Sequence, residues 1–363
     1  MKFKVPKSTF LDALTLVQNI VGSRQTLPVL SNALIVAEEG RLVFTTTDLD
    51  MTIRCCCDAE VEEQGSVTLP VKKLSAIVRE LNDGAVHIET DENATAAIRA
   101  GSFRSRMFGL AGKEFPKMPD FENALTYKIS QAKLKDMLRK TFYAAAVDNS
   151  KPLLTGILLN FENGKLTAVA TDGRRLALYE TEVDLPEANK KDMVISQRAA
   201  AELIKTLGDD GDVVLKFADT QLTFEFNDIF IATKLLSGTY PNYRQVVIQN
   251  CANVISINRE ELLAVVRRIN ASTTSTASAM RLNFENNILT VTASSSDIGD
   301  ATDTVAIKYD GEPLSVIFNP EFVIDPLKNL TSDEIQIELN NSTSPGLIKS
   351  DIPFLYVIMP LRV

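Results

Sequence analysis

The chain repeats itself at about one third of its length, and a tandem repeat restricts the possible folds more than composition does. Three strand-like runs end in an aspartate, at Asp48, Asp172 and Asp297, and these aspartates are 124 and 125 residues apart. A dipeptide typical of hairpin turns precedes each run: Glu39-Gly40, Asn163-Gly164 and Asn286-Asn287. The pattern predicts three copies of one unit.

A second landmark has the same period. Leu69, Ile195 and Phe318 each precede a helical pattern, and they are spaced by 126 and 123 residues. Because one third of 363 is 121, three units fill the chain. We expect domains at 1–122, 126–247 and 252–363, joined by linkers at 113–127 and 237–254 that each contain an aromatic-proline step.

Each unit is itself duplicated, as a strand, a helix and several further strands, twice over. Apolar spacing predicts six helices: Lys7–Val21, Pro70–Asn82, Gln131–Ala145, Gln197–Leu207, Arg259–Ser272 and Pro320–Leu330. Pro326 lies inside the last window and is expected to kink or shorten that helix. The stretches between the helices alternate as strands do, so the predicted fold class is α+β.

The net charge of −9 argues against a chain coated in nucleic acid. The charge is unevenly divided, however. The six helix windows hold 14 basic and eight acidic residues, a net charge of +6, while the rest of the chain carries −15. Helices presenting to one side would form a weakly basic surface on an acidic body, which suits contact with a phosphate backbone.

The start of the chain lacks the apolar core of a signal peptide, and no apolar run is long enough to span a membrane. We therefore expect a cytoplasmic protein without a membrane partner. Four cysteines, three of them consecutive, do not form a disulfide framework in that compartment.

Candidate chemical groups are few. Cys55-Cys56-Cys57 lie in a strand-like run without the spacing of metal ligands, and we interpret them as structural. His87, the single histidine, alternates with apolar residues and is expected on the solvent face of a strand. The recurring aspartates favour a shared structural role at a strand end. Neither a cofactor nor a metal is expected.

Two features break the repeat. After the shared aspartate the middle unit has Gly173-Arg174-Arg175-Leu176, whereas the other two units have unrelated residues there. The segment Phe354–Leu361 is too apolar for a frayed terminus. It is predicted to be a buried last strand, a partner-binding surface, or one continuing into the other.

Taken together, these features resemble the bacterial DNA polymerase III beta subunit family, the sliding clamps. The resemblance covers all 363 residues. Its most specific segments are Arg24–Asn32, Ala170–Ala177, Tyr240–Arg244 and Tyr356–Arg362.

The resemblance implies a head-to-tail homodimer ring of six similar domains, with helices lining the hole and sheets outside. Duplex DNA would thread the hole without sequence-specific contact. The ring would tether the DNA polymerase III alpha subunit, and the clamp loader and other proteins with a clamp-binding motif would be further partners. No activity of an enzyme is implied.

The resemblance also implies three sets of site residues. The DNA-facing set is Arg24, Arg79, Lys151 and Arg198. The groove for partner peptides, between the second and third units, comprises Leu154, Thr171, Gly173, Arg174, Arg175, Leu176, Pro241, Val246, Val357, Met359, Pro360, Leu361 and Arg362. The dimer interface pairs Arg104, Arg106 and Met107 with Arg268, Ile269 and Asn270.

Two other functions are compatible with parts of the sequence. A metal-dependent nuclease could use Asp48, Asp50 and Asp172 as its carboxylates. A peptide-binding scaffold that never meets DNA could use the apolar C-terminal segment alone. Gln245 and Thr343 stand where the family often has an arginine and an apolar residue, which bears on the peptide preference.

Overall fold

The structure is a computed structural model, and its chain divides into two compact units. Unit 1 comprises 1–132 and 205–235, and unit 2 comprises 133–204 and 236–363. The described residues are 1–22, 27–118, 121, 124–148, 150–183, 191–218, 220–248, 251–272, 279–295 and 298–362. Within them, no helix is long and apolar enough to cross a membrane.

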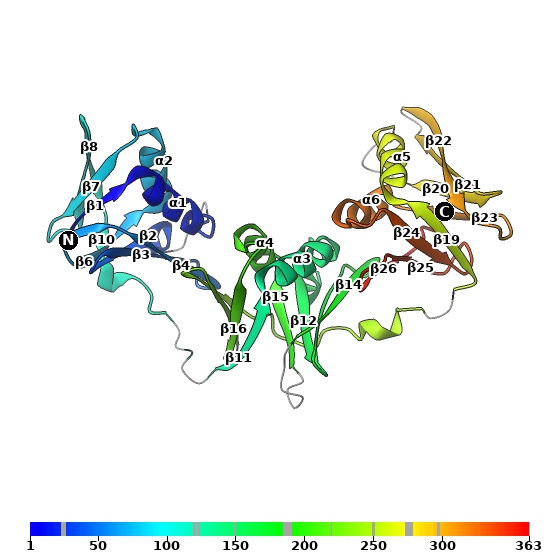
Figure 1. Ribbon diagram of the computed structural model, residues 1–363, viewed down its shortest axis with the longest axis horizontal. Coiled ribbons are helices and arrows are strands. Elements are labelled where there is room, and N and C mark those ends of the chain that lie inside the picture. Colours follow the sequence, from blue (N-terminus) through cyan, green and yellow to red (C-terminus); the bar gives the residue numbers. More distant parts are fainter. Residues whose placement is uncertain are drawn as a thin grey trace. The chain divides into compact units, whose positions relative to one another are not determined.

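Unit 1 contains two sheets and the helices α1 and α2 (Figure 1). Its helices and strands are β1 (Lys2–Pro6), α1 (Lys7–Gln18), β2 (Asn32–Glu38), β3 (Arg41–Thr47), β4 (Met51–Asp58), β5 (Glu60–Glu63), β6 (Gly65–Pro70), α2 (Val71–Glu80), β7 (Ala85–Thr90), β8 (Thr95–Ala100), β9 (Phe103–Phe108), β10 (Leu110–Ala111), β11 (Leu125–Ser130), β16 (Asp212–Ala218), β17 (Gln221–Phe226) and β18 (Ile229–Lys234). The strand orders are β5-β1-β7-β8-β9 and β10-β6-β2-β3-β4-β18-β17-β16-β11.

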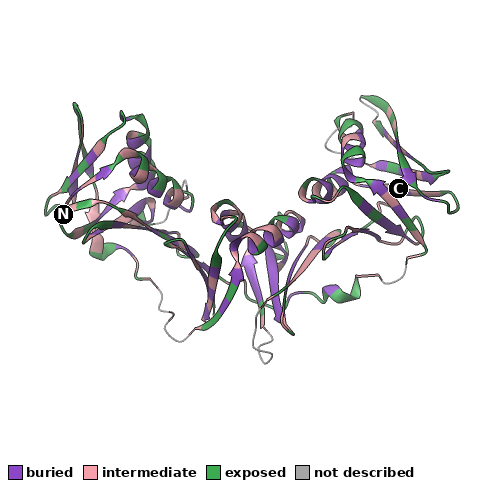
Figure 2. Ribbon diagram, viewed as in Figure 1, coloured by how far each residue is buried: buried purple, intermediate pink, exposed green. Residues whose placement is uncertain are grey.

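The helices of unit 1 bury their apolar stripes against the sheets. Helix α1 packs on β1, β3, β4 and on α2. Phe10, Leu14 and Val17 recur at helical spacing on one face of α1 and are fully buried. The Phe10 ring lies 6.3 Å from that of Phe3 and 5.8 Å from that of Phe44. The helix faces that meet the sheets are the buried ones, and the opposite faces are exposed or half-buried (Figure 2).

Unit 2 contains one large sheet. Its elements are α3 (Gln131–Thr141, which begins in unit 1), β12 (Gly156–Glu162), β13 (Lys165–Thr171), β14 (Arg175–Glu182), β15 (Lys191–Ser196), α4 (Gln197–Thr206, which ends in unit 1), β19 (Asn253–Asn258), α5 (Arg259–Ala271), β20 (Met280–Glu285), β21 (Ile288–Ser295), β22 (Gly299–Lys308), β23 (Leu314–Phe318), α6 (Pro320–Asn329), β24 (Glu334–Leu339), β25 (Gly346–Lys349) and β26 (Phe354–Ile358). The strand order is β15-β12-β13-β14-β26-β25-β24-β19-β22-β21-β20-β23.

The element order confirms the predicted repeat. The series strand, helix, three strands occurs six times along the chain, beginning at β1, β6, β11, β15, β19 and β23. All six predicted helices are present, and each ends between one and four residues before the end of its window. The hairpin turns have left-handed backbone, with φ of 76° at Gly40, 53° at Asn163 and 52° at Asn286.

Strands of different repeats pair edge to edge, and this explains why two compact units arise from three predicted domains. β4 of the first repeat pairs with β18 of the second, and β14 of the second repeat pairs with β26 of the third. The strands of the middle repeat are therefore divided between the two units. The predicted boundaries at 1–122, 126–247 and 252–363 stay a prediction.

Of the two effects expected of Pro326, a kink or a shortening of the helix, the shortening does not occur in α6. The helix continues for three residues beyond it and is ten residues long, like α2 and α4. Proline lacks the N–H that would bond to the carbonyl four residues earlier, which belongs to Phe322. The Tyr356 hydroxyl donates to that carbonyl instead, at 2.8 Å. A side chain from the last strand thus replaces the missing helical hydrogen bond.

This replacement makes a testable prediction. Tyr356→Phe should lower the free energy of unfolding by about 1–3 kcal/mol, because the partly buried Phe322 carbonyl loses its donor. In a Pro326→Ala background the backbone N–H at position 326 can serve that carbonyl, so the same change should cost less. Urea unfolding of the four proteins measures the difference. An equal cost in both backgrounds would contradict the compensation.

Candidate functional site

The turn after Asp172 presents the segment that distinguishes the middle repeat. The Asp172 carboxylate accepts the backbone N–H of Arg174 at 2.8 Å and of Arg175 at 3.0 Å. The Thr171 hydroxyl donates to the Arg175 carbonyl at 2.6 Å and accepts the N–H of Gly173 at 3.1 Å. Gly173 has φ of 87°, and its α-carbon faces open space. Gly173 and Arg174 are consequently exposed at the start of β14.

The C-terminal segment lies beside this turn. Strand β26 is buried and pairs with both β14 and β25. The Met359 N–H then donates to the Arg174 carbonyl at 2.9 Å, and the Leu361 N–H donates to the Ile317 carbonyl at 2.8 Å. The Met359 side chain is 42% exposed. The apolar segment is thus a buried strand that continues into a partly exposed tail.

An apolar cluster lies beneath the turn and the tail. Of the predicted groove residues, it contains Leu154, Leu176 and Val357, all at most 5% exposed. Its other buried members are Ala146, Leu158, Val169, Val194, Tyr240, Tyr243 and Leu347. Close to it in sequence, Pro241 and Val246 are exposed, and Val246 is 46% exposed.

Sequence reasoning missed part of this cluster. Tyr240 and Tyr243 belong to a segment that carried the family resemblance, yet the prediction took only Pro241 from it. Both tyrosine rings are buried in the cluster. The two tyrosines, three residues apart, were a sign of burial, but nothing in the sequence shows that this linker packs near β14 and β26. Pro360 and Leu361 are half-buried and Arg362 is exposed, and none of the three is a member of the cluster.

Arg175 is held inside the chain, whereas its neighbour Arg174 is exposed. The Arg175 guanidinium donates to the Asp172 carboxylate at 3.1 Å, to the Tyr143 carbonyl at 2.7 Å and to the Asp325 carboxylate. It also stacks over the Phe322 ring, 4.4 Å from its centre. Only 9% of its side chain is exposed. The Arg175 side chain is thus held by contacts within its own chain, and its contact with a peptide stays a prediction.

The network around Arg175 connects three elements. Tyr143 follows α3, Asp325 and Phe322 belong to α6, and Asp172 precedes β14. Burial lowers the pKa of the Arg175 guanidinium, but Tyr356 and Asp325 outweigh that effect and raise the pKa above its usual range. The charge of Arg175 is thus permanent, and it fixes the turn that carries Gly173 and Arg174.

The predicted DNA-facing residues lie on exposed positions where they are described. Arg79 is in the last turn of α2, Arg198 is in the first turn of α4, and Lys151 precedes a 3-10 turn at Pro152–Thr155. All three side chains are exposed. Arg24 lies outside the described residues.

The predicted interface residues fall near two sheet edges. β9 pairs only with β8 in the described part of the chain, and it exposes Arg104 and Arg106. Arg268 of α5 donates to Asp303 of β22 at 2.7 Å, and Asn270 donates to Glu321 at 2.8 Å.

Two of the predicted interface residues are buried in the single chain. The side chains of Met107 and Ile269 are 8% and 2% exposed, so they pack inside their own chain. Phe108, one residue after Met107, is 76% exposed and was not among the predicted interface residues. In a strand, a shift of one residue moves the side chain to the other face of the sheet.

Two of the three shared aspartates, Asp48 and Asp172, have the structural role at a strand end that the sequence predicts. Asp48 accepts the N–H groups of Asp50 and Met51 at 3.0 and 2.8 Å, in the manner of Asp172. Asp297 lies outside the described residues. In the described ranges, no group of three or more His, Cys, Asp or Glu side chains is placed to hold a metal ion.

The cysteines alternate across β4. Cys55 is buried and Cys56 and Cys57 are half-buried. Burial raises the pKa of the Cys55 and Cys57 thiols to about 12, so both remain protonated at neutral pH.

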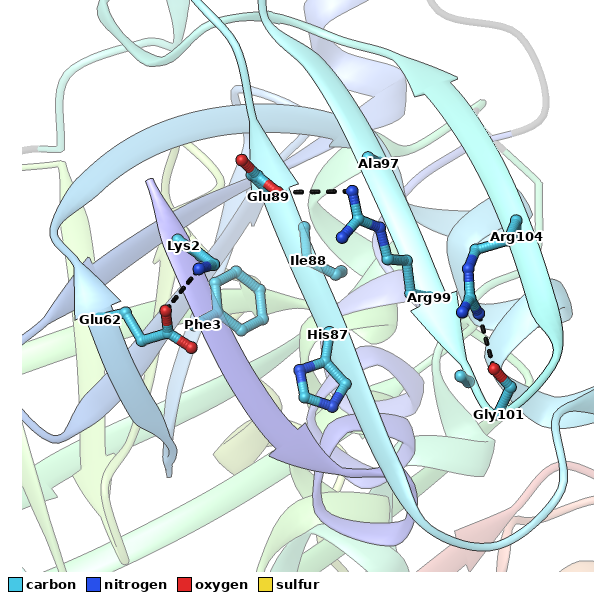
Figure 3. A pocket seen from close by; sticks show the side chains of 11 residues that line it. Lys2, Phe3, Glu62, His87, Ile88, Glu89, Ala97, Arg99, Gly101 and Arg104 are labelled. Carbon is cyan, nitrogen blue, oxygen red and sulfur yellow. Dashed lines mark hydrogen bonds and ion pairs between the residues drawn. The ribbon is translucent and has the colours of Figure 1, made fainter.

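His87 is exposed on β7, as predicted, and lines a shallow pocket on the sheet of β1, β7, β8 and β9 (Figure 3). The charges around it are paired: Lys2 with Glu62 at 2.6 Å, and Arg99 with Glu89 at 3.6 Å. The hydrogen bond between Lys2 and Glu62 raises the pKa of the lysine and lowers that of the glutamate.

Comparison with known proteins identifies the class. Family models of the N-terminal, central and C-terminal domains of the DNA polymerase III beta subunit match residues 1–119, 128–242 and 244–362. The beta sliding clamp of Chlamydia trachomatis is 33% identical over 363 residues, which cover all of this chain and 87% of the relative. That of Synechococcus elongatus is 33% identical over 374 residues, with both chains fully covered.

Solved structures agree with these relatives. The DNA polymerase sliding clamp from Bacillus subtilis superimposes with a TM-score of 0.96, at 28% identity, over 100% of this chain and 99% of that one. A sliding clamp from Bartonella birtlesii bound to griselimycin gives a TM-score of 0.95 at 31% identity, with both chains fully covered. The sixfold motif and these likenesses define a DNA sliding clamp. The chain belongs to the DNA polymerase III beta subunit family, whose members act as processivity factors in DNA replication.

The buried position of Arg175 predicts unequal effects for two adjacent arginines. Arg175→Met should lower the free energy of unfolding by about 3 kcal/mol, because Asp172 and Asp325 lose a buried partner. Arg174→Met, the matched control, should change it by less than about 0.5 kcal/mol. Urea unfolding checks both values, and similar losses for the two variants would show that the Arg175 network is not stabilising.

Proposed function

We propose that two copies of this chain close head to tail into a ring that encircles duplex DNA and tethers DNA polymerase III to its template. The observation that carries the proposal is a pair of complementary sheet edges. In the described part of the chain, β9 of unit 1 pairs with β8 alone. On β22 of unit 2, residues 299–306 pair with β21 alone, because β19 reaches only Ile307 and Lys308.

The two edges differ in charge, and β9 also exposes an apolar side chain. β9 presents Arg104, Arg106 and the 76% exposed Phe108, whereas the first half of β22 carries the exposed Asp300 and also Asp303, which Arg268 of the same chain binds. An exposed edge readily accepts another strand, and opposite charges favour pairing across it. Because the edges belong to different units, joining β9 of one copy to β22 of another leaves the reverse pair available. Two copies can therefore form a closed ring.

The helices support a role in holding DNA. Five of the six expose basic side chains: Lys72, Lys73 and Arg79 on α2; Lys133 and Arg139 on α3; Arg198 and Lys205 on α4; Arg267 and Arg268 on α5; and Lys328 on α6. We propose that Arg24, Arg79, Lys151 and Arg198 face the phosphate backbone. Such contacts attract DNA without reading sequence and weaken with salt, so the ring can slide.

We further propose that client proteins dock an extended segment on the apolar cluster of unit 2. Leu154, Leu176, Val357 and Met359 would receive apolar side chains, and the exposed Arg174 and Arg362 would receive polar or acidic ones. The clients include the DNA polymerase III alpha subunit and the clamp loader, and the protein works in the cytoplasm. Griselimycin, which is bound in a related clamp, is proposed to occupy the same place.

Ring closure and DNA retention can be tested together. Wild-type protein should sediment at twice the 39.9 kDa mass of the chain. Once loaded, it should stay on nicked circular DNA and be lost after the circle is linearised. Phe108→Arg should sediment as single chains and fail to stay on circles, because it places a charge at the apolar part of the edge. Val254→Arg, which also replaces an exposed apolar residue, should behave as wild type. A Phe108→Arg dimer retained on circles would refute the proposed interface.

Docking on the apolar cluster can be tested separately. Truncation after Ile358 should abolish griselimycin binding and stimulation of the polymerase, because it removes Met359 and the rest of the tail. Isothermal titration calorimetry measures the binding, and sedimentation confirms that the dimer persists. Met359→Lys should weaken binding at least tenfold, with the backbone contact to Arg174 intact. Unchanged affinity in both variants would place the site elsewhere.

A further inference from the structure

The junction of β4 and β18 in unit 1 has the same backbone frame as the junction of β14 and β26 in unit 2. Leu176 lies opposite Val357, and its repeat equivalent Thr52 lies opposite Ala232. In unit 2 the Met359 N–H donates to the Arg174 carbonyl at 2.9 Å. In unit 1 the Lys234 N–H donates to the Asp50 carbonyl at 2.8 Å. In both units, a backbone N–H at the end of the second strand thus donates to a carbonyl of the turn.

The turn itself is repeated bond for bond. The Thr47 hydroxyl donates to the Met51 carbonyl and accepts the N–H of Leu49, as Thr171 does for Arg175 and Gly173. Asp48 accepts two backbone N–H groups, as Asp172 does.

The surroundings of the turn are repeated as well. Pro28–Ser31 and Pro152–Thr155 are 3-10 turns in equivalent places, and each buries one leucine. The aromatic-proline step Phe115-Pro116 corresponds to Tyr240-Pro241. In unit 1 a hollow of 180 Å³ remains, lined among others by Leu49, Pro116, Ala232 and Lys234.

Four of the differences between the two junctions bear on an apolar ligand. Leu49, with φ of 76°, occupies the left-handed position that Gly173 leaves open. The remaining three changes remove apolar surface: Leu176, Val357 and Met359 of unit 2 correspond to Thr52, Ala232 and Lys234 of unit 1.

An ion pair also lies at the unit 1 junction, where an apolar ligand would bind. The Lys234 ammonium lies 3.0 Å from the Asp50 carboxylate, and the Thr52 hydroxyl donates to the Thr47 hydroxyl at 2.9 Å. An apolar ligand at this place would have to displace the ion pair and would find little apolar surface in return. Unit 1 therefore has the backbone arrangement of the docking site but lacks the apolar surface that would bind an apolar side chain of a ligand.

We infer that unit 1 carries a second copy of the client-docking frame, and that Leu49, Thr52, Ala232 and Lys234 keep it from binding. These four positions would determine that each chain offers one docking site. The inference rests on the proposed docking site of unit 2, because the side chains that unit 1 lacks are identified by comparison with that site.

The test counts griselimycin molecules per chain by isothermal titration calorimetry on the full-length protein. Wild type should bind one. The variant Leu49→Gly, Thr52→Leu, Ala232→Val, Lys234→Met transplants the unit 2 residues and should bind two. The reciprocal variant Leu176→Thr, Val357→Ala, Met359→Lys should bind none, and the combination of both sets should bind one through unit 1.

Thermal unfolding of each variant establishes that it is folded. If the fourfold variant does not fold, the pair Leu49→Gly and Lys234→Met, which changes two largely exposed side chains, replaces it. That pair should show a second site at least tenfold weaker than the first. One ligand per chain in a folded transplant would overturn the inference while leaving the docking site of unit 2 intact. No binding to wild type would overturn the docking proposal itself.

Discussion

The pairing of strand edges between repeats is the constraint on which the rest of the structure depends. An isolated β-α-β-β-β motif ends in strands whose N–H and C=O groups have no partner on one side, and such edges invite association. Joining β4 to β18 and β14 to β26 satisfies these groups and merges the sheets of neighbouring repeats. The place where two repeats join is also where a turn, a linker and a strand end come together.

If clients dock at the unit 2 junction as proposed, the side chains of a junction rather than its backbone decide whether it binds them. Both junctions use the same threonine and aspartate hydrogen bonds, yet Gly173 and Met359 leave one open and apolar while Leu49 and Lys234 close the other. The same division of labour applies to the two arginines of unit 2. The Arg175 guanidinium donates hydrogen bonds to Asp172, Asp325 and the Tyr143 carbonyl, whereas Arg174 is exposed.

The sequence predicted the features that depend on local periodicity. The repeat, the six helices and the hairpin turns follow from spacing and from residues that accept left-handed backbone, and all of them are present. Features that depend on contacts distant in sequence could not be foreseen. Pro326 indicated a kinked or shortened helix, because nothing in the sequence shows that the Tyr356 hydroxyl donates to the Phe322 carbonyl. The burial of Met107 and the exposure of Phe108 could not be foreseen either, because a face of a strand cannot be chosen until the register of its sheet is known.

The pairing of β14 with β26 also has a consequence for synthesis of the protein. About 180 residues separate Arg175 from its partner Ile358. At a translation rate of about 5–20 residues per second, the edge of β14 waits on the order of 10–40 seconds for the strand that covers it. During that interval the nascent chain exposes an apolar strand edge at the ribosome. A cell making this protein therefore has to keep that edge from pairing with other chains until the last residues have emerged.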